Sequence, residues 1–171
     1  MIERRAALIE LRAAGRRLEG YAATFGTEAR ISDFIETIAA GAFRGSLAAD
    51  KDILALVDHD PTRLLARTRS GSLRLVEDAK GLAFGIDVPD TRDGHDVLAL
   101  AERGDLGGMS FSFTVPPGGE RWEGRRRELR SVNLREISVV SAFPAYDGTT
   151  VHARAAAPRL RAARLWLETA Q

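Results

Sequence analysis

The sequence contains no cysteine. This absence excludes disulfide bonds, thiolate zinc sites and a cysteine nucleophile, and it fits a reducing cytoplasm. Long apolar runs are missing as well, because the first ten residues carry an apolar run of only four before Glu10 and no run elsewhere approaches the length of a membrane span. A signal peptide needs a longer apolar core, and a spanning helix needs about 20 apolar residues. We therefore expect a soluble chain with no signal peptide and no membrane partner.

Lysine is scarce, since only two of the 25 basic residues, Lys51 and Lys80, are lysines. An arginine bias of this kind is typical of a GC-rich genome; the alternative is that the guanidinium groups bind carboxylates or phosphates. The 24 acidic residues leave a formal net charge of +1. So small a charge creates no overall field that would attract nucleic acid, and we expect no specific nucleic-acid partner.

The common signatures of phosphate, dinucleotide and metal sites are also absent. The chain has no GxxxxGKS/T loop and no GxGxxG, HExxH or GxSxG segment. Its three histidines are His59, His95 and His152. In the segment 58–60 (DHD), an extended strand would turn the two aspartates to one face and the imidazole to the other. We therefore expect neither a metal ion nor a cofactor.

The composition is that of an ordinary globular protein. The 171 residues are 44% hydrophobic and 29% charged, which suffices for one domain with its own core. We place this domain at residues 1–152. Residues 153–171 follow as an Ala/Arg-rich linker and an amphipathic C-terminal helix, because apolar side chains from Leu160 to Ala170 recur at helical spacing.

The apolar pattern predicts a mainly β domain with helices inserted between the strands. We expect strands at residues 17–25, 53–59, 64–69, 72–77, 81–88, 109–115 and 134–142, a hairpin within 121–133, helices at 39–49 and 90–103, and an ambiguous segment at 31–38. Thr91 or Asp93 is expected to cap the second helix, and Gly104 to end it. Short strands separated by regular turns favour a barrel or a sandwich over a doubly wound parallel sheet.

The pattern of polar residues predicts which parts of two of these segments face solvent or share a face. The segment 109–115 (MSFSFTV) alternates strictly, so that its apolar side chains share one face while Ser110, Ser112 and Thr114 share the other. The tip of the 121–133 hairpin, residues 123–127 (EGRRR), is charged, and we expect it to face solvent.

His59 and Ser110 are candidate functional residues. If the strand before His59 is regular, the imidazole shares a face with Val57 and other apolar residues, where neighbours can set its tautomer, as a general base requires. The alternative is a surface histidine in a turn. Ser110 follows Gly107 and Gly108, where a glycine-rich bend lets a substrate backbone approach closely. The alternative is a serine that faces solvent.

Glu136 is a third candidate, because it is an acid within the apolar segment 134–142. A carboxylate buried there needs a cation or a hydrogen-bond donor. The alternatives are a glutamate on an edge strand that faces water, and a pairing with Arg135. A hydroxyl, an imidazole and a carboxylate permit a nucleophile, a base and an orienting acid, but periodicity alone does not bring them within hydrogen-bond reach.

A series of short segments in a fixed order carries a resemblance to a known family. The segments are LEGYAATF at 18–25, GAF at 41–43 with SL at 46–47, DHD at 58–60, GL at 81–82, GGMSFSF at 107–113, LREISVV at 134–140 and PAY at 144–146. Over about residues 18–150 the chain resembles the prohead maturation proteases of tailed bacteriophages. The resemblance implies a serine endopeptidase with the fold of herpesvirus assemblins, a seven-stranded β-barrel surrounded by helices.

The resemblance also implies roles for the three candidates. His59 matches the base, Ser110 the nucleophile and Glu136 a third member of a triad, for which herpesvirus relatives use a second histidine. His152 or His95 could replace Glu136 in that role. The chain departs from the family at Ser112, which stands where glycine is usual and adds a second hydroxyl to the same strand face.

The implied substrates are the scaffold or the N-terminal segment of the major capsid protein, and the protease itself. The implied location is the assembling prohead in the cytoplasm of the bacterial host, whether of a phage, a defective prophage or a gene transfer agent. We expect Arg135 or a backbone amide within 142–149 to serve as the oxyanion donor, and the resemblance to assemblins, which dimerise through helices, implies a homodimer. The alternatives are a catalytically inactive capsid assembly or scaffolding module with the same fold, and a β-barrel that binds a small ligand.

Overall fold

The computed structural model describes residues 1–7, 11–49 and 51–141. Its strands are β1 (Glu3–Ala7), β2 (Leu11–Ala14), β3 (Arg17–Thr24), β4 (Ala29–Ile31), β5 (Phe34–Ile38), β6 (Leu54–Val57), β7 (Asp60–Arg67), β8 (Leu73–Glu77), β9 (Gly81–Asp87), β10 (Gly108–Thr114), β11 (Glu120–Glu123), β12 (Arg126–Leu129) and β13 (Asn133–Val140). Its helices are α1 (Arg44–Ala48) and α2 (Arg92–Arg103). The expectation of a mainly β fold with inserted helices is confirmed. The predicted linker and helix after residue 152 lie outside the described residues.

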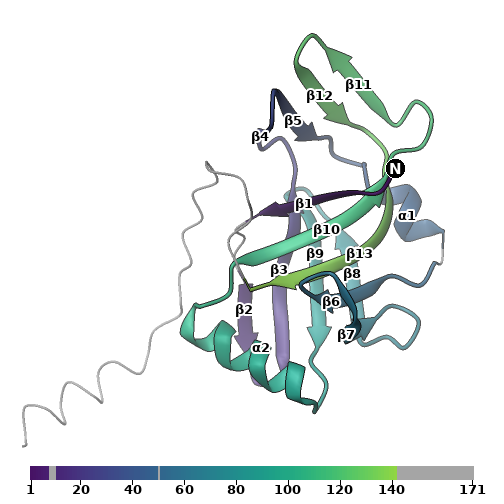
Figure 1. The fold of residues 1–171 in the computed structure, drawn as a ribbon. Helices are drawn as coiled ribbons and strands as arrows, with labels where there is room; N and C mark the ends of the chain where they lie inside the picture. The colour runs from purple at the N-terminus through teal and green to yellow at the C-terminus, as the bar shows by residue number, and fades with distance from the viewer. Residues whose placement is uncertain (8–10, 50, 142–171) are drawn as a thin grey trace, which may run out of the picture.

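The strands form three sheets (Figure 1). A five-stranded sheet has the order β1-β10-β13-β6-β7, and two four-stranded sheets have the orders β2-β3-β9-β8 and β11-β12-β5-β4. Most neighbouring strands are antiparallel, while β13 with β6 and β12 with β5 are parallel. The pairings within the described ranges do not close into a barrel, so the seven-stranded barrel finds no support in them.

Strand β10 shows the predicted alternation, and both of its faces are buried. Phe111 and Phe113 point into the core, where the ring of Phe111 lies 5.3 Å from that of Phe113 and 5.6 Å from that of Phe43. Ser110 and Ser112 point to the other face and are almost fully covered. The alternative that Ser110 faces solvent is therefore wrong in this structure.

Helix α2 forms where the sequence predicts it, because its end signals are local. The hydroxyl of Thr91 accepts a hydrogen bond from the backbone N–H of Gly94, which caps the first turn. Gly104 ends the helix in the left-handed conformation, with φ of 75°. The helix packs against β2 and β7, at the end of the molecule opposite β11 and β12 (Figure 1).

The prediction that one strand runs from residue 53 to His59 and stops at Asp60 is wrong. Strand β6 ends at Val57, and Asp60 already pairs with Val57 as the first residue of β7. Asp58 and His59, with φ of 51° and 61°, form the two-residue turn between them. A two-residue hairpin with both φ values positive matches the twist of the flanking strands, and aspartate and histidine tolerate this conformation better than most residues do. The prediction that His59 shares a face with Val57 is wrong for the same reason.

Arg127 contradicts the expectation that residues 123–127 face solvent, because its side chain is only 7% exposed. It lies on β12 beside the buried Glu36 of β5, its direct partner in the parallel register. The guanidinium group binds Glu36 at 3.0 Å and also binds Glu3 and Glu120, each at 2.5 Å. Since a buried carboxylate on the neighbouring strand requires a cation, Arg127 binds this cluster of carboxylates, while the rest of the hairpin tip faces water.

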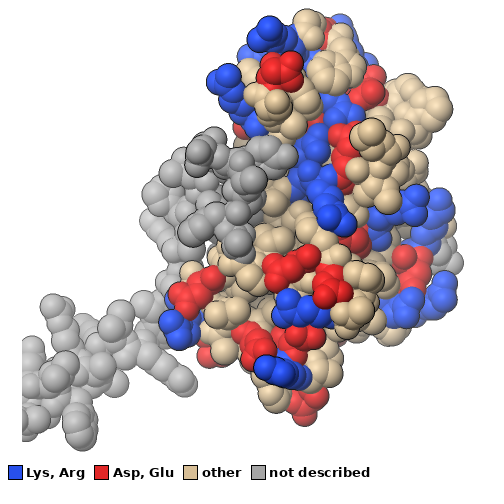
Figure 2. All heavy atoms as spheres, viewed as in Figure 1, with Lys and Arg blue, Asp and Glu red and all other residues tan. Residues whose placement is uncertain are grey.

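The same cluster holds the N-terminal strand, which the sequence does not predict. Arg5 of β1 binds Glu36 through two nitrogens, at 2.5 and 2.8 Å, and Glu3 at 2.7 Å. Elsewhere, positive and negative side chains are mixed over the face shown in Figure 2. The surface in that view offers no broad field of one sign.

Gly81, at the start of β9, provides a test of the β3–β9 pairing. A Cβ at this position would lie 2.1 Å from the carbonyl oxygen of Ala23, so the backbone would have to shift. We expect Gly81→Ala to lower the free energy of unfolding by about 1–3 kcal/mol.

The matched control is Gly85→Ala on the same strand, where a Cβ would meet Arg74 at an ordinary 3.8 Å. We expect this variant to stay within about 1 kcal/mol of the original chain or to be more stable. Urea denaturation measures both values, and equal losses in the two variants would contradict the close approach of β3 and β9.

Candidate active site

The turn at residues 58 and 59 places His59 at the end of the five-stranded sheet. The N–H of Asp58 donates to the carbonyl of Val139 at 2.9 Å, and its carboxylate accepts from the N–H and the hydroxyl of Ser141, both at 2.8 Å. Arg63 adds an ion pair to Asp58 at 3.2 Å. Both the backbone and the side chain of Asp58 therefore attach the turn to the end of β13, and this attachment fixes the direction of the imidazole.

His59 and Glu136 meet in a short hydrogen bond. The Nδ1 atom of His59 lies 2.7 Å from Oε1 of Glu136, and the side chains are 15% and 11% exposed. Since a carboxylate accepts hydrogen bonds, Nδ1 carries the proton, and Nε2 of a neutral ring is left free to accept one. This is the tautomer that a general base requires.

Ser138 completes the surroundings of Glu136. Its hydroxyl donates to Oε2 of Glu136 at 2.5 Å and accepts from the backbone N–H of His59 at 3.3 Å. Both carboxylate oxygens of Glu136 therefore have donors, although β13 lies in the middle of the sheet. The alternatives that Glu136 faces water on an edge strand or pairs with Arg135 are wrong. Glu136 is buried on a central strand, and Arg135 is exposed on the opposite face of β13.

Burial alone would raise the pKa of Glu136, because water is lost from around the charged form. The hydrogen bonds from His59 and Ser138 outweigh this effect and hold the pKa of Glu136 below its ordinary value of 4.5. Glu136 is therefore ionised at neutral pH and stabilises a positive charge on the ring beside it.

Ser110 lies on the same face of the sheet as this pair. The register of β10 against β13 sets Ser110 opposite Ser138, and Ser112 opposite Glu136. Cross-strand partners point to the same side of a sheet, so the four side chains form one polar face that ends at His59. The hydroxyl of Ser110 donates to the carbonyl oxygen of Arg5 on β1 at 2.9 Å, and the side chain is 1% exposed.

The other sequence candidates are not brought to this face. His95 lies on α2, where its Nε2 meets Asp90 at 2.6 Å in an exposed position. Arg135 points away from Glu136, which removes it as an oxyanion donor in this arrangement. His152 and the proposed donors within 142–149 lie outside the described residues.

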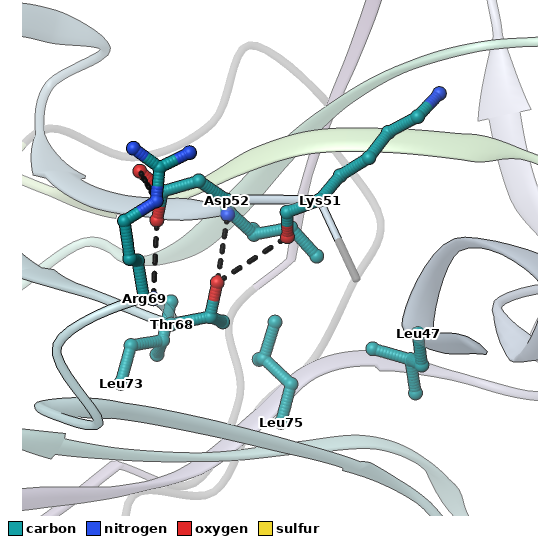
Figure 3. A pocket seen from close by; sticks show the side chains of 8 residues that line it. Leu47, Lys51, Asp52, Thr68, Arg69, Leu73 and Leu75 are labelled. Carbon is teal, nitrogen blue, oxygen red and sulfur yellow. Dashed lines mark hydrogen bonds and ion pairs between the residues drawn. The ribbon is translucent and has the colours of Figure 1, made fainter. Parts of the chain in front are cut away.

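A cavity of about 590 Å³ lies elsewhere, between the end of α1, the segment before β6 and the β7–β8 turn (Figure 3). Its polar groups bind one another: Thr68 accepts from the N–H of Ile53, and Asp52 accepts from Arg67 and from the N–H of Arg69. The cavity contains none of Ser110, His59 and Glu136. Within the described ranges no group of three or more possible metal ligands occurs, and no helix is long and apolar enough to span a membrane.

An imidazole oriented by an ionised acid, on a sheet face that also carries a serine, is the arrangement found in serine peptidases. Comparison with protein families agrees with this class. The family model described as caudovirus prohead serine protease matches residues 3–161, and the chain belongs to that family. The comparisons with curated proteins and with solved structures give no match.

Sequence reasoning missed the contacts that Ser138, Asp58 and Arg5 make at this site. Ser138 had a local signal, since it lies two residues after Glu136 on one strand and therefore shares its face. The role of Asp58 depends on a turn conformation that the pattern does not encode. Arg5 approaches Ser110 only through a pairing across more than a hundred residues, for which the sequence carries no periodicity.

The Glu136 interactions predict how stability depends on pH. A carboxyl group with a lowered pKa in the folded state stabilises the fold above its unfolded pKa, and this contribution is lost as the pH falls through the folded value. We expect Glu136→Gln to cost about 1–3 kcal/mol at pH 7, and the difference from the original chain to shrink as the pH falls below about 4.5.

Glu102→Gln is the control, because Glu102 is exposed on α2. It removes the same charge without a buried partner and should give a small difference at every pH. Thermal or urea denaturation between pH 3 and pH 7 measures both, and a Glu136→Gln effect that does not change with pH would contradict the assigned hydrogen bonds.

Proposed function

We propose that this protein is a serine endopeptidase in which Ser110 is the nucleophile, His59 the general base and Glu136 the acid that orients the base. One observation carries the proposal: the 2.7 Å hydrogen bond between Nδ1 of His59 and Glu136, on the sheet face that carries Ser110. Membership in a serine peptidase family supports it. No residue role in this proposal requires a metal ion or a cofactor.

The reaction is an acyl transfer. The Oγ atom of Ser110 attacks the carbonyl carbon of the scissile peptide bond while Nε2 of His59 takes its proton. The tetrahedral intermediate collapses, the C–N bond breaks, and His59 returns the proton to the leaving amine. Water then attacks the carbonyl carbon of the acyl-enzyme and gives one proton to His59. The bond between this carbon and Oγ breaks, His59 passes the proton to Oγ of Ser110, and the carboxylic acid product leaves. Glu136 stabilises the imidazolium ion at both stages.

The physiological substrates in this proposal are the scaffold or the N-terminal segment of the major capsid protein, and the protease itself. The family supports capsid protein substrates in general. Inside an assembling prohead in the host cytoplasm, enzyme and substrate are confined together, and the high effective concentration lets a weak, permissive site suffice. The same reasoning applies to a phage, a prophage or a gene transfer agent. A homodimer and a closed seven-stranded barrel are further parts of the proposal.

The rival function is a catalytically inactive assembly module with the same fold. The largely buried His59–Glu136 pair argues against it, because burying a carboxylate and an imidazole costs free energy that a purely structural strand end does not require. A β-barrel for a small ligand is not favoured, because the cavity near Asp52 is open and the carboxylate of Asp52 is already hydrogen-bonded to Arg67 and to the N–H of Arg69.

A serine-directed fluorophosphonate probe tests the proposed nucleophile. We expect Ser110→Ala to abolish labelling and to reduce cleavage of the co-expressed major capsid protein by about a thousandfold or more, since a triad without its nucleophile retains only residual catalysis. The mass of the capsid protein after co-expression reports the second quantity.

Ser112→Ala is the matched control, because Ser112 lies two residues further along the same face of β10. It should keep its labelling. If Ser112→Ala loses labelling while Ser110→Ala keeps it, the nucleophile is Ser112 and the assignment of Ser110 is wrong. A chain that is never labelled and never shortens the capsid protein would favour the inactive assembly module.

A further inference from the structure

The geometry points to a strand of the chain itself at the position where a substrate peptide must bind. We propose that β1 covers Ser110 and that it must separate from β10 before an extended peptide can pair with β10 and be cleaved. This inference rests on the proposed function, because it concerns access to the same serine.

The first observation is the contact between β1 and the serine. Strand β1 pairs antiparallel with β10, and Ala6 lies directly opposite Ser110. The Ser110 hydroxyl donates to the carbonyl of Arg5 rather than to His59. While this bond holds, its proton is directed at β1, and a substrate carbonyl cannot reach the Oγ atom because the side chain is 1% exposed.

The second observation is the place of β1 in the sheet. It is the last strand of the order β1-β10-β13-β6-β7, so its departure leaves the pairing of β10 with β13 intact. Figure 1 shows β1 lying along β10 at this edge. A freed edge offers a row of unpaired N–H and C=O groups, which an extended peptide can join as an added strand. Main-chain pairing of this kind accepts many sequences.

The third observation is what holds β1 in place. Glu3 and Arg5 lie opposite Phe113 and Phe111 in the register, and they therefore point away from the face of Ser110. Arg5 binds the buried Glu36, and Glu3 binds Arg127. These ion pairs form a charged clamp on β1, which lies on the side of the sheet opposite the catalytic face. The clamp can therefore be loosened without changing the site.

The rate of fluorophosphonate labelling reports how often Ser110 is uncovered. We expect Arg5→Gln to label at least about tenfold faster than the original chain, since the rate scales with the fraction of open molecules. Arg126→Gln is the matched control: it removes the same charge from an exposed ion pair with Glu28 in another sheet, and it should label at the original rate. Circular dichroism verifies that each variant is folded.

Amide hydrogen exchange of the unaltered chain tests the same inference without any substitution. We expect the amides of β1 to exchange through local opening, with protection at least about tenfold lower than that of β13. Equal protection of β1 and β13 would overturn the inference, because β1 would then leave only when the whole domain unfolds. A folded Arg5→Gln that labels at the original rate would overturn it as well.

The two proposals fail in different ways. If the probe labels neither the original chain nor Ser110→Ala, and Arg5→Gln is not labelled, the proposed function fails and the inference falls with it. If Ser110 is labelled quickly in the original chain and Arg5→Gln gives no increase, the peptidase stands and only the covering role of β1 is lost.

Discussion

The register in which β10 pairs with β13 is the constraint on which the site depends. It sets Ser110 opposite Ser138, and Ser112 opposite Glu136, so that the polar side chains of two central strands share one face while the phenylalanines of β10 fill the core on the other. Alternate residues of a strand point to opposite faces, and a slip of one residue would therefore send the acid into the core and the aromatic rings to the polar face. Strand β6 runs parallel to β13 and ends where the turn delivers His59 to Glu136. The core and the candidate active site thus lie on opposite faces of the same pair of strands, β10 and β13.

Two buried carboxylates show how the fold separates structural from chemical roles. Glu36 is held by Arg5 and Arg127, whose charges do not titrate near neutral pH, and it joins β1, β5 and β12. Glu136 is held by an imidazole and a hydroxyl, so its partner is a side chain of the kind that serves as a general base and not a permanent cation. The first arrangement is a fixed clamp, and the second leaves a ring nitrogen available for proton transfer. Both satisfy the requirement that a buried charge be paired, but only the second suits catalysis.

Local signals in the sequence predict much of the fold, and tertiary contacts decide the rest. The helix at 92–103 forms as predicted because its caps lie within a few residues of its ends, and the strands at 17–24, 81–87 and 108–114 follow from alternation. The direction of His59 could not be predicted, since it depends on two left-handed residues that the apolar pattern does not distinguish from a continuing strand. Arg127 is buried because of a carboxylate on a strand far away in sequence, and β1 forms only because β10 offers it an edge. Glu136 could be identified as an acid that needs a partner, but the partner could be found only in the folded chain.

Crystallography of the fluorophosphonate adduct tests the proposed chemistry most directly. We expect phosphorus bound to Oγ of Ser110, Nε2 of His59 within hydrogen-bond distance of the adduct, and Nδ1 still bound to Glu136. A bond to another serine, or an adduct on Ser110 with the imidazole turned away from it, would contradict the assignment of these three residues to one peptidase site.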